Sequence, residues 1–199
     1  RYKLDEPVRP IYRSKTCEVY YATDVLADNA PVCLKIIRDR INFESERRSR
    51  EIKLDEAYVV EVLRYIEDST TREFRTSGTK IGAPSWETDP TVDEFALVMP
   101  CANKNLCEAI MSERFAGHDL TTVEYISNSV AKALKHMHDQ GLVHGDVKPR
   151  NVVRDANGKW KLIDLDAAAK LSEPIGRKYS SAFSPPELAK LLFSSTGES

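Results

Sequence analysis

The sequence predicts an α+β fold, because its strand-like segments come first and its helix-like segments follow. The first hundred residues contain short β-prone runs, such as residues 17–24 and 31–37. In residues 121–140, by contrast, apolar side chains recur every three or four positions, which is the period of an amphipathic helix. With 199 residues, the chain has room for one large domain or two small lobes.

The amino-acid composition limits which kinds of binding partner and which cellular compartment we expect for this chain. Lysine and arginine number 29 against 31 aspartate and glutamate, so the net charge of −2 gives no reason to expect nucleic acid or a membrane surface. No apolar run approaches the roughly 18 residues of a membrane span. The chain begins without Met, and we expect further domains outside it. The four cysteines, which form no Cys-x-x-Cys pair, favour a reducing, cytoplasmic location; they are Cys17, Cys33, Cys101 and Cys107.

The first segments alternate strand signals with turns. An Ala-Asp-Asn turn separates residues 17–24 from 31–37. Residues 43–57 are charged and have helical spacing. The remaining segments before the helical part are a strand-like run at 58–67, a loop rich in Ser, Thr, Gly and Pro at 68–94, and a buried strand at 95–100.

The later segments carry helix and hairpin signals. Thr121 and Glu124 fit a capping box at the start of the 121–140 helix, and Gly141 stands where a C-terminal cap belongs. Two short apolar pieces, 151–154 and 159–165, are joined by Asp-Ala-Asn-Gly, which predicts a β-hairpin.

Lys35 is an unusual residue for its position. It lies in a strand that is apolar on both faces, so its ammonium group is partly desolvated and needs an anionic partner. Glu46 and Glu51, on the following helix, are candidates. The alternative is that Lys35 belongs to an edge strand and extends its side chain to water.

Asp146, Lys148 and Asn151 lie between the capped helix and the hairpin, and Asp164 follows the hairpin's second strand. A hairpin brings its ends together, so Asn151 and Asp164 are expected to be neighbours. Two oxygen ligands at one loop edge suit Mg²⁺, and Lys148 could neutralise a phosphoryl group. Each residue alone is better explained as a turn-former, but their order and spacing together favour phosphate chemistry.

These motifs resemble those of eukaryotic-type protein kinases. HGDVKPRN (144–151) resembles the catalytic loop, VCLK the strand with the phosphate-binding lysine, and ALVMPCANKNL the hinge, with Met99 as gatekeeper. DLD (164–166) stands at Asp-Phe-Gly and SPPE (184–187) at Ala-Pro-Glu. The resemblance implies a two-lobed protein-kinase-like fold of serine/threonine type. Residues 1–100 would form the β-rich small lobe up to the hinge, and 101–199 the front half of the mainly helical large lobe, with the catalytic loop and activation segment.

The resemblance also implies roles for individual residues. Asp146 would accept or orient the proton of the substrate hydroxyl, and Lys148 would stabilise the γ-phosphoryl group of ATP. Asn151 and Asp164 would hold Mg²⁺. Lys35 would position phosphates while paired to an acid, for which we prefer Glu46 over Glu51. The adenine would meet main-chain groups near Pro100 and Ala102 and pack against Val19, Cys33 and Val153, beside the gatekeeper Met99.

Three departures from the family pattern stand out. The glycine-rich phosphate loop falls on YRSKTC (12–17), which has no glycine. Binding of ATP would therefore be weaker, or its phosphate contacts would shift to Ser14, Lys15 or Thr16. Gly145 replaces the arginine that reads activation-segment phosphorylation. Asp166 replaces the glycine of Asp-Phe-Gly and adds a carboxylate, which would either bind a second ion or raise the pKa of Asp164.

The leading hypothesis is therefore ATP- and Mg²⁺-dependent phosphoryl transfer to serine or threonine hydroxyls of a protein substrate. The alternative is a pseudokinase, a nucleotide-binding or scaffolding module without significant turnover, which the missing glycines and Asp166 favour. A small-molecule kinase with the same fold is a third hypothesis. PPEL and the segment before it weigh against this third hypothesis, because they resemble a surface for a peptide substrate.

Overall fold

The computed structural model of the chain describes residues 1–67, 74–75, 95–173 and 181–194. The chain divides into two compact units. The first comprises residues 1–44 and 60–102, and the second comprises residues 45–59 and 103–199. Among the described helices, none is both long enough and apolar enough to cross a membrane. The α+β class predicted from the sequence is confirmed, because the first unit is rich in strands and the second contains the long helices.

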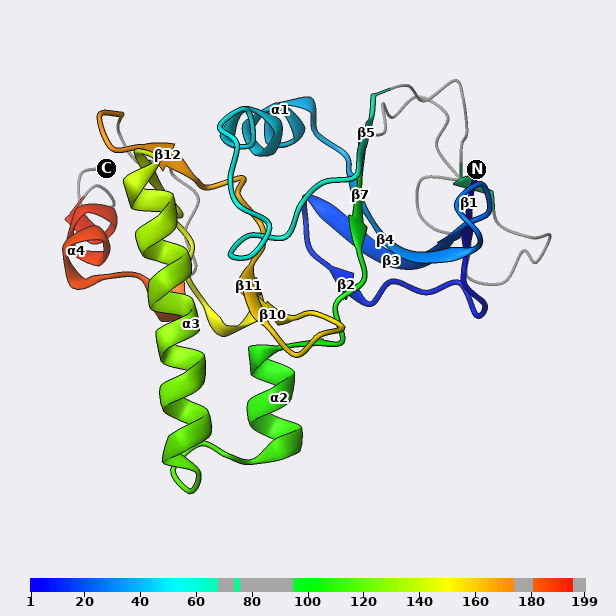
Figure 1. Ribbon diagram of the computed structural model, residues 1–199. Coiled ribbons are helices and arrows are strands. Elements are labelled where there is room, and N and C mark those ends of the chain that lie inside the picture. The colour runs from blue at the N-terminus through cyan, green and yellow to red at the C-terminus, as the bar shows by residue number, and fades with distance from the viewer. Residues whose placement is uncertain (68–73, 76–94, 174–180, 195–199) are drawn as a thin grey trace. The chain divides into compact units, whose positions relative to one another are not determined.

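The first unit is built on one seven-stranded sheet (Figure 1). Its strand order is β5-β7-β4-β3-β1-β6, and β2 pairs with β3. The β1–β6 pair is parallel and the other pairs are antiparallel. The strands are β1 (Tyr2–Leu4), β2 (Tyr12–Arg13), β3 (Cys17–Asp24), β4 (Ala30–Ile37), β5 (Arg64–Ile66), β6 (Phe74–Arg75) and β7 (Phe95–Pro100).

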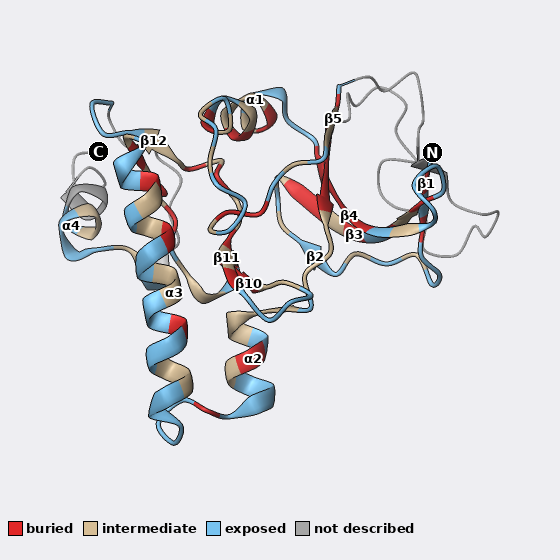
Figure 2. Ribbon diagram, viewed as in Figure 1, coloured by how far each residue is buried: buried red, intermediate tan, exposed pale blue. Residues whose placement is uncertain are grey.

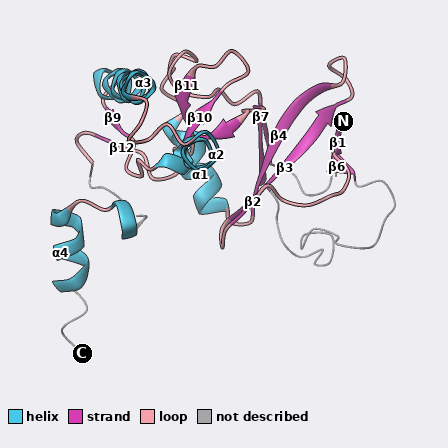
Figure 3. Cartoon of the chain, turned by 90° about the horizontal axis from the view of Figure 1, so that it is seen from below, coloured by secondary structure: helices cyan, strands magenta, loops and turns pink. Residues whose placement is uncertain are grey.

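The two longest strands, β3 and β4, form the centre of this sheet (Figure 3). They pair along their whole length, from Cys17 opposite Ile37 to Asp24 opposite Ala30. The predicted turn between them is confirmed, with Asp28 and Asn29 at φ 49° and 57°, a left-handed region that Asp and Asn tolerate. Alternate side chains of both strands enter an apolar core that includes Tyr20, Ala22, Val32, Leu34 and Ile36.

The next helix and strand have bounds that differ from those predicted from the sequence. The helix predicted at 43–57 is α1 (Arg40–Ser49), which begins after Asp39, whose carboxylate accepts a hydrogen bond from the N–H of Ile41. The strand predicted at 58–67 is limited to β5. Residues 45–59 belong to the second compact unit, and their apolar side chains pack in its core; these are Ile52, Leu54, Tyr58 and Val59.

The second unit combines helices with three short ladders. Its helices are α2 (Leu106–Glu113), α3 (Leu120–Asp139) and α4 (Pro186–Ser194), with 3₁₀ turns η2 (Pro149–Asn151) and η3 (Ser181–Phe183). β8 (Lys104–Asn105), β10 (Val152–Arg154) and β11 (Trp160–Leu162) form one sheet, and β9 (Leu142–Val143) pairs with β12 (Ala169–Lys170). The predicted hairpin is confirmed as β10–β11, with Val152 opposite Leu162.

The predicted amphipathic helix is confirmed as α3, with buried positions recurring along one side (Figure 2). Its capping box was predicted wrongly, since the N-cap is Asp119, which accepts a hydrogen bond from the N–H of Thr122. Gly141 ends the helix as predicted, at φ 77°, where glycine avoids the strain of a left-handed backbone. The helix packs on the second core through Ile126, Ala133 and Met137.

Candidate active site

The loop between β9 and β10 is organised around a buried histidine. Asp146 donates its backbone N–H to His144 Nδ1 at 3.3 Å, and the ring's Nε2 lies 3.0 Å from the carbonyl of Ile163. Nδ1 is therefore the acceptor and Nε2–H the donor. Burial lowers the pKa of His144 below its usual value, so the neutral ring holds the loop against the β11 side of the hairpin.

The three loop residues that were predicted from the sequence do come together. Lys148 Nζ lies 2.6 Å from Asp146 Oδ2. Asn151 Nδ2 donates to the Asp146 carbonyl at 2.9 Å and lies 3.3 Å from Oδ2. Asp146 and Asn151 are buried, so these bonds form in a region of low dielectric where they fix both side chains. Because its amide nitrogen is engaged in this way, Asn151 keeps a carbonyl oxygen that suits a cation.

Asp164 follows the other strand of the hairpin, as expected. Ile163 donates its N–H to the Asn151 carbonyl at 3.0 Å, so the backbones at Asn151 and Asp164 lie at the same end of the hairpin. Asp164 adopts φ 68°, a left-handed conformation uncommon for residues other than glycine. Strained backbone of this kind is often found at functional sites.

Three carboxylates meet next to this hairpin end. Oxygen atoms of Glu46, Asp164 and Asp166 lie within 4.8 Å of one another. A set of hard oxygen donors of this type fits a divalent cation such as Mg²⁺ or Ca²⁺, whereas softer metals prefer nitrogen or sulfur ligands. The residues present therefore fit the divalent metal that the sequence predicts, and Asp166 and Glu46 extend the predicted ligand pair.

Glu46 is tied to its surroundings by contacts that sequence reasoning missed. Its Oε1 accepts from Arg50 Nη2 at 3.0 Å and from the N–H of Leu165 at 3.2 Å. The side chains of Glu46 and Arg50 are 1% and 8% exposed, and their i, i+4 spacing was a signal that could have revealed the pair. Ser45 also donates to the carbonyl of Asp166 at 2.8 Å. The end of α1 is thereby attached to the segment that carries Asp164 and Asp166.

Gly145 is required by the backbone around it. It adopts φ 78°, and a Cβ built at this position would lie 2.1 Å from the carbonyl oxygen of Ala167. A Cβ cannot approach a backbone oxygen so closely, so no side chain fits here without movement of the chain. This crowding gives a physical reason for the absence of the arginine that the resemblance led us to look for at this position.

Four of the predicted nucleotide-binding residues of the first unit share one face of its sheet. Val19 pairs with Lys35 across β3 and β4, and Cys33 pairs with Met99 across β4 and β7. Directly opposed residues point to the same side, and Cys33 and Lys35 are two positions apart on one strand. Lys35 is 6% exposed, so the alternative of an edge-strand lysine reaching water is wrong. Pro100 ends β7, and Ala102 ends the first unit.

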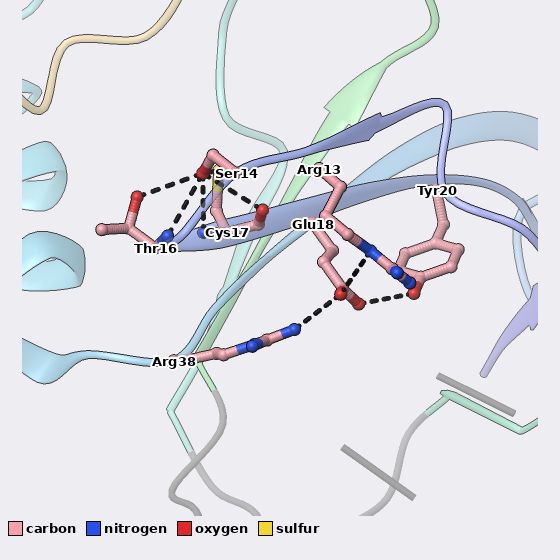
Figure 4. Close-up of polar contacts among 7 residues, drawn as sticks. All are labelled: Arg13, Ser14, Thr16, Cys17, Glu18, Tyr20 and Arg38. Carbon is pink, nitrogen blue, oxygen red and sulfur yellow. Dashed lines mark hydrogen bonds and ion pairs between the residues drawn. The ribbon is translucent and has the colours of Figure 1, made fainter. Parts of the chain in front are cut away.

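The glycine-free loop is a tight turn between β2 and β3 that is closed by Ser14 (Figure 4). Ser14 Oγ accepts from the N–H groups of Thr16 at 3.2 Å and Cys17 at 3.1 Å. The N–H of Ser14 in turn donates to the Cys17 carbonyl at 2.9 Å. Two backbone donors that a phosphate would need are therefore already bound to a side chain.

An ionic cluster around the buried Glu18 lies at the base of this loop (Figure 4). Glu18 is 1% exposed, with Arg13 Nε at 2.9 Å and Arg38 Nη2 at 2.6 Å. Tyr20 donates its hydroxyl to Glu18 at 2.6 Å, and burial together with this carboxylate raises the pKa of the phenol. Sequence reasoning missed this cluster, although a glutamate at an inward-facing strand position indicated it. The cluster links β2, β3 and the end of β4.

A separate cavity of about 460 Å³ lies within the second unit. Its lining includes Glu113 from α2, Tyr125 from α3, and Arg154 and Trp160 from the hairpin. Arg154 Nη2 and Lys104 Nζ lie 2.6 and 2.8 Å from Glu113 Oε1, and they lower the pKa of that carboxyl to about 2. None of the residues predicted for catalysis lines this cavity, so it is distinct from the candidate active site.

Of the other predicted residues, Val153 and Glu51 lie in the second unit. Val153 is buried in β10, opposite Asn105 and Lys161. Glu51 is exposed and lies two residues beyond the end of α1, whereas Glu46 is buried within the helix. Since Lys35 belongs to the first unit and Glu46 to the second, the ion pair between them stays a prediction.

Several known proteins are similar in sequence to parts of this chain. Serine/threonine-protein kinase PSK2 of Saccharomyces cerevisiae is 48% identical over 44 residues, which is 22% of this chain and 4% of that protein. Serine/threonine-protein kinase F of Synechocystis is 33% identical over 72 residues, 33% of this chain and 14% of that protein. Serine/threonine-protein kinase dkf-1 of Caenorhabditis elegans is 30% identical over 105 residues, 49% of this chain and 14% of that protein.

These matches cover only a small part of each relative, but the family match extends over most of the chain. Residues 13–196 match the protein kinase domain family. The matched range includes the Asp146 cluster, the three carboxylates and the Ser14 loop. On this evidence the chain belongs to the protein kinase domain family.

Proposed function

We propose that this chain forms part of a serine/threonine protein kinase that transfers the γ-phosphoryl group of ATP to hydroxyls of a protein substrate. The observation that carries the proposal is the hydrogen-bonded cluster of Asp146, Lys148 and Asn151, held at the hairpin end next to Asp164. A carboxylate, an ammonium group and a carboxamide in this order match the requirements of phosphoryl transfer, in which the protein mainly positions groups and balances charge.

In this mechanism Asp146 accepts the proton of the substrate hydroxyl as the hydroxyl oxygen attacks the γ-phosphorus. The bond from that phosphorus to the β-phosphate oxygen breaks, and ADP leaves. The Asn151 amide orients the Asp146 carboxylate, and His144 fixes the backbone that carries it. Lys148 lies at the same carboxylate, where its ammonium group would offset the charge of the phosphoryl group.

The proposal assigns a metal and a nucleotide to further residues. Asn151 and Asp164 would hold Mg²⁺, which when bound supplies neutralisation of the phosphate charge. Lys35 would position phosphates while paired with Glu46. Adenine would be bound by the six remaining residues predicted from the sequence, which are Val19, Cys33, Met99, Pro100, Ala102 and Val153.

Some expectations about the whole protein stay predictions. They are the division into a small lobe at 1–100 and part of a large lobe at 101–199, a cytoplasmic location, the absence of a nucleic-acid partner, and further domains outside this chain.

A pseudokinase is the second candidate, and the Ser14 loop favours it. The N–H groups of Thr16 and Cys17 are bound by Ser14, so they are not available to phosphates in this conformation. A protein with this loop would bind nucleotide weakly unless the turn opens. An active kinase and a pseudokinase would therefore have the same fold, but only the active kinase would transfer phosphate with significant turnover.

The deciding experiment measures transfer of labelled γ-phosphate from ATP with Mg²⁺ by the full-length protein and by its Asp146→Asn variant. We expect transfer to serine or threonine in the wild type and a loss of about 10²- to 10⁴-fold in the variant, because the proton acceptor is removed. Nucleotide binding, measured by thermal shift, should be equal in the two proteins, since the variant keeps the rest of the site.

Other outcomes assign the protein to another class. A wild type that binds ATP but transfers no phosphate to proteins or to itself would establish the pseudokinase. Transfer to a metabolite alone would indicate a small-molecule kinase. Equal turnover in the wild type and the Asp146→Asn variant would contradict the role of Asp146.

A further inference from the structure

Two thiols lie side by side where β4 and β7 meet. Cys33 is on β4 opposite Met99, and Cys101 follows the end of β7. The two Sγ atoms are 3.6 Å apart although the residues are 68 positions apart in sequence. Both belong to the first unit, and the pairing of β4 with β7 brings them together.

The two thiols differ in solvent exposure and in how readily they lose their protons. Cys33 is buried, at 8% exposure, whereas Cys101 is partly exposed. Cys33 donates its S–H to Cys101, and this hydrogen bond lowers the pKa of the Cys101 thiol. The same contact, together with burial, raises the pKa of Cys33. Cys101 is therefore the sulfur that solvent reaches first and the one that more readily becomes the nucleophilic thiolate.

We propose that Cys33 and Cys101 are a reversible oxidation site that closes to an intramolecular disulfide when the protein meets a peroxide. The required movement is small. A disulfide places its sulfurs about 2.05 Å apart, so two atoms now 3.6 Å apart approach by roughly 1.5 Å. The strands already hold the two residues next to each other, which favours this bridge over one to a distant partner.

The chemistry has two steps. The Cys101 thiolate attacks one oxygen of hydrogen peroxide, so that an S–O bond forms, the O–O bond breaks and hydroxide leaves, taking up a proton to become water. The Cys33 sulfur then attacks the resulting sulfenic sulfur, an S–S bond forms, the S–O bond breaks, and the departing hydroxide takes the Cys33 proton. Two thiols and one peroxide thus give one disulfide and two waters, and a dithiol such as dithiothreitol reverses the oxidation.

One consequence rests on the proposed function. Cys33 and the main chain next to Cys101, at Pro100 and Ala102, are among the groups proposed to meet adenine. Bound nucleotide would then cover the pair and slow its oxidation. ATP at ten times its Kd leaves about one tenth of the protein free, so we expect the rate of disulfide formation to fall about tenfold.

The test is thiol mapping of the reduced, full-length protein after exposure to hydrogen peroxide. Remaining thiols are alkylated with N-ethylmaleimide under denaturing conditions, and the non-reduced peptides are analysed by mass spectrometry. We expect a linked Cys33–Cys101 peptide pair that dithiothreitol removes. Oxidation of Cys101 to the sulfinic acid without a bridge, or bridges from Cys101 to other cysteines or between molecules, would overturn the proposal.

Two cysteine variants test whether Cys101 is required for the linked peptide pair and whether Cys107 is not. Cys101→Ser should abolish the linked pair and leave Cys33 open to alkylation after denaturation. Cys107→Ser, at a partly exposed cysteine of α2, should leave the yield of the pair unchanged. A bridge that forms equally fast with and without ATP would uphold the oxidation site while contradicting the adenine site, so the two proposals fail separately.

Discussion

At Gly145 any side chain would reduce the stability of the fold for two separate reasons. The positive φ alone disfavours other residues by roughly 1–2 kcal/mol, and a Cβ would in addition meet the Ala167 carbonyl at 2.1 Å. We expect Gly145→Ala to lower the free energy of unfolding by about 3 kcal/mol or more, since overpacking adds about 1–3 kcal/mol to the conformational cost. Urea unfolding of the purified variant measures this change.

Gly158 provides a matched control for this prediction. It adopts φ 79°, close to the value at Gly145, but a Cβ there would meet nothing within 4 Å. Gly158→Ala should therefore cost only the conformational part, about 1 kcal/mol. Equal losses for the two variants would show that the approach of Ala167 to Gly145 is not maintained in solution.

His144 gives the loop between β9 and β10 a predictable dependence on pH. Its folded-state pKa lies below the usual value of 6.5 because burial disfavours the charged ring. The hydrogen bond to Ile163 and the nearby carboxylates partly offset this effect. The unfolded chain therefore binds a proton that the folded chain resists. The stabilisation is complete above pH 6.5 and is lost as pH falls through 6.5 toward the lower folded pKa.

We expect the free energy of unfolding to decrease as the pH falls over this range. In a His144→Gln variant the part of this decrease that comes from His144 should be absent. Urea unfolding at several pH values between about 8 and 5 gives the slope. A His144→Gln variant with an unchanged slope would contradict the buried, neutral ring.

At the scale of elements, the Ser14 turn is the feature that most affects the proposed activity. Ser14→Ala removes the acceptor for the N–H groups of Thr16 and Cys17. We expect a loss of about 1 kcal/mol in stability, and tighter binding of ATP by a few fold if the freed donors meet phosphate. Isothermal titration with ATP and Mg²⁺ measures the change in affinity.

Thr16→Val is the matched control for the loop. It removes a hydroxyl that lies 3.3 Å from Ser14 Oγ, but the two N–H contacts of Ser14 do not involve that hydroxyl. Affinity for ATP should therefore stay at the wild-type value. Equal affinities for wild type and Ser14→Ala would show that the turn does not contact the nucleotide phosphates.

The elements that local pattern predicted well are those with a strong period or an explicit turn. β3, β4, β7, α3 and the β10–β11 hairpin all appear close to the predicted bounds. The helix over 43–57 was predicted too long, because Leu54 continues the helical spacing of Phe43, Arg47 and Arg50. In the structure Ile52 and Leu54 instead pack in the second core as irregular chain. Their apolar contacts in the fold outweigh a weak local preference.

At the scale of the whole molecule, the predicted Lys35–Glu46 ion pair would join the two units. Lys35→Met, Glu46→Gln and the double variant form a cycle that measures it. We expect a coupling of about 1–3 kcal/mol in the free energy of unfolding, as for charged residues in direct contact. The cycle with Glu51→Gln should give no coupling, because Glu51 is exposed beyond α1. Coupling of Lys35 with Glu51 but not with Glu46 would show that Glu51 is the acid paired with Lys35.

The sequence by itself determined the fold class, the family resemblance and the grouping of Asp146, Lys148, Asn151 and Asp164. These follow from short-range pattern, since a capped helix followed by a hairpin leaves few ways to place the residues between them. Only the tertiary structure decided which contacts close around that group. The approach of Ala167 to Gly145, the buried Glu46–Arg50 pair and the two neighbouring thiols join residues whose contacts depend on packing, which local sequence pattern does not encode.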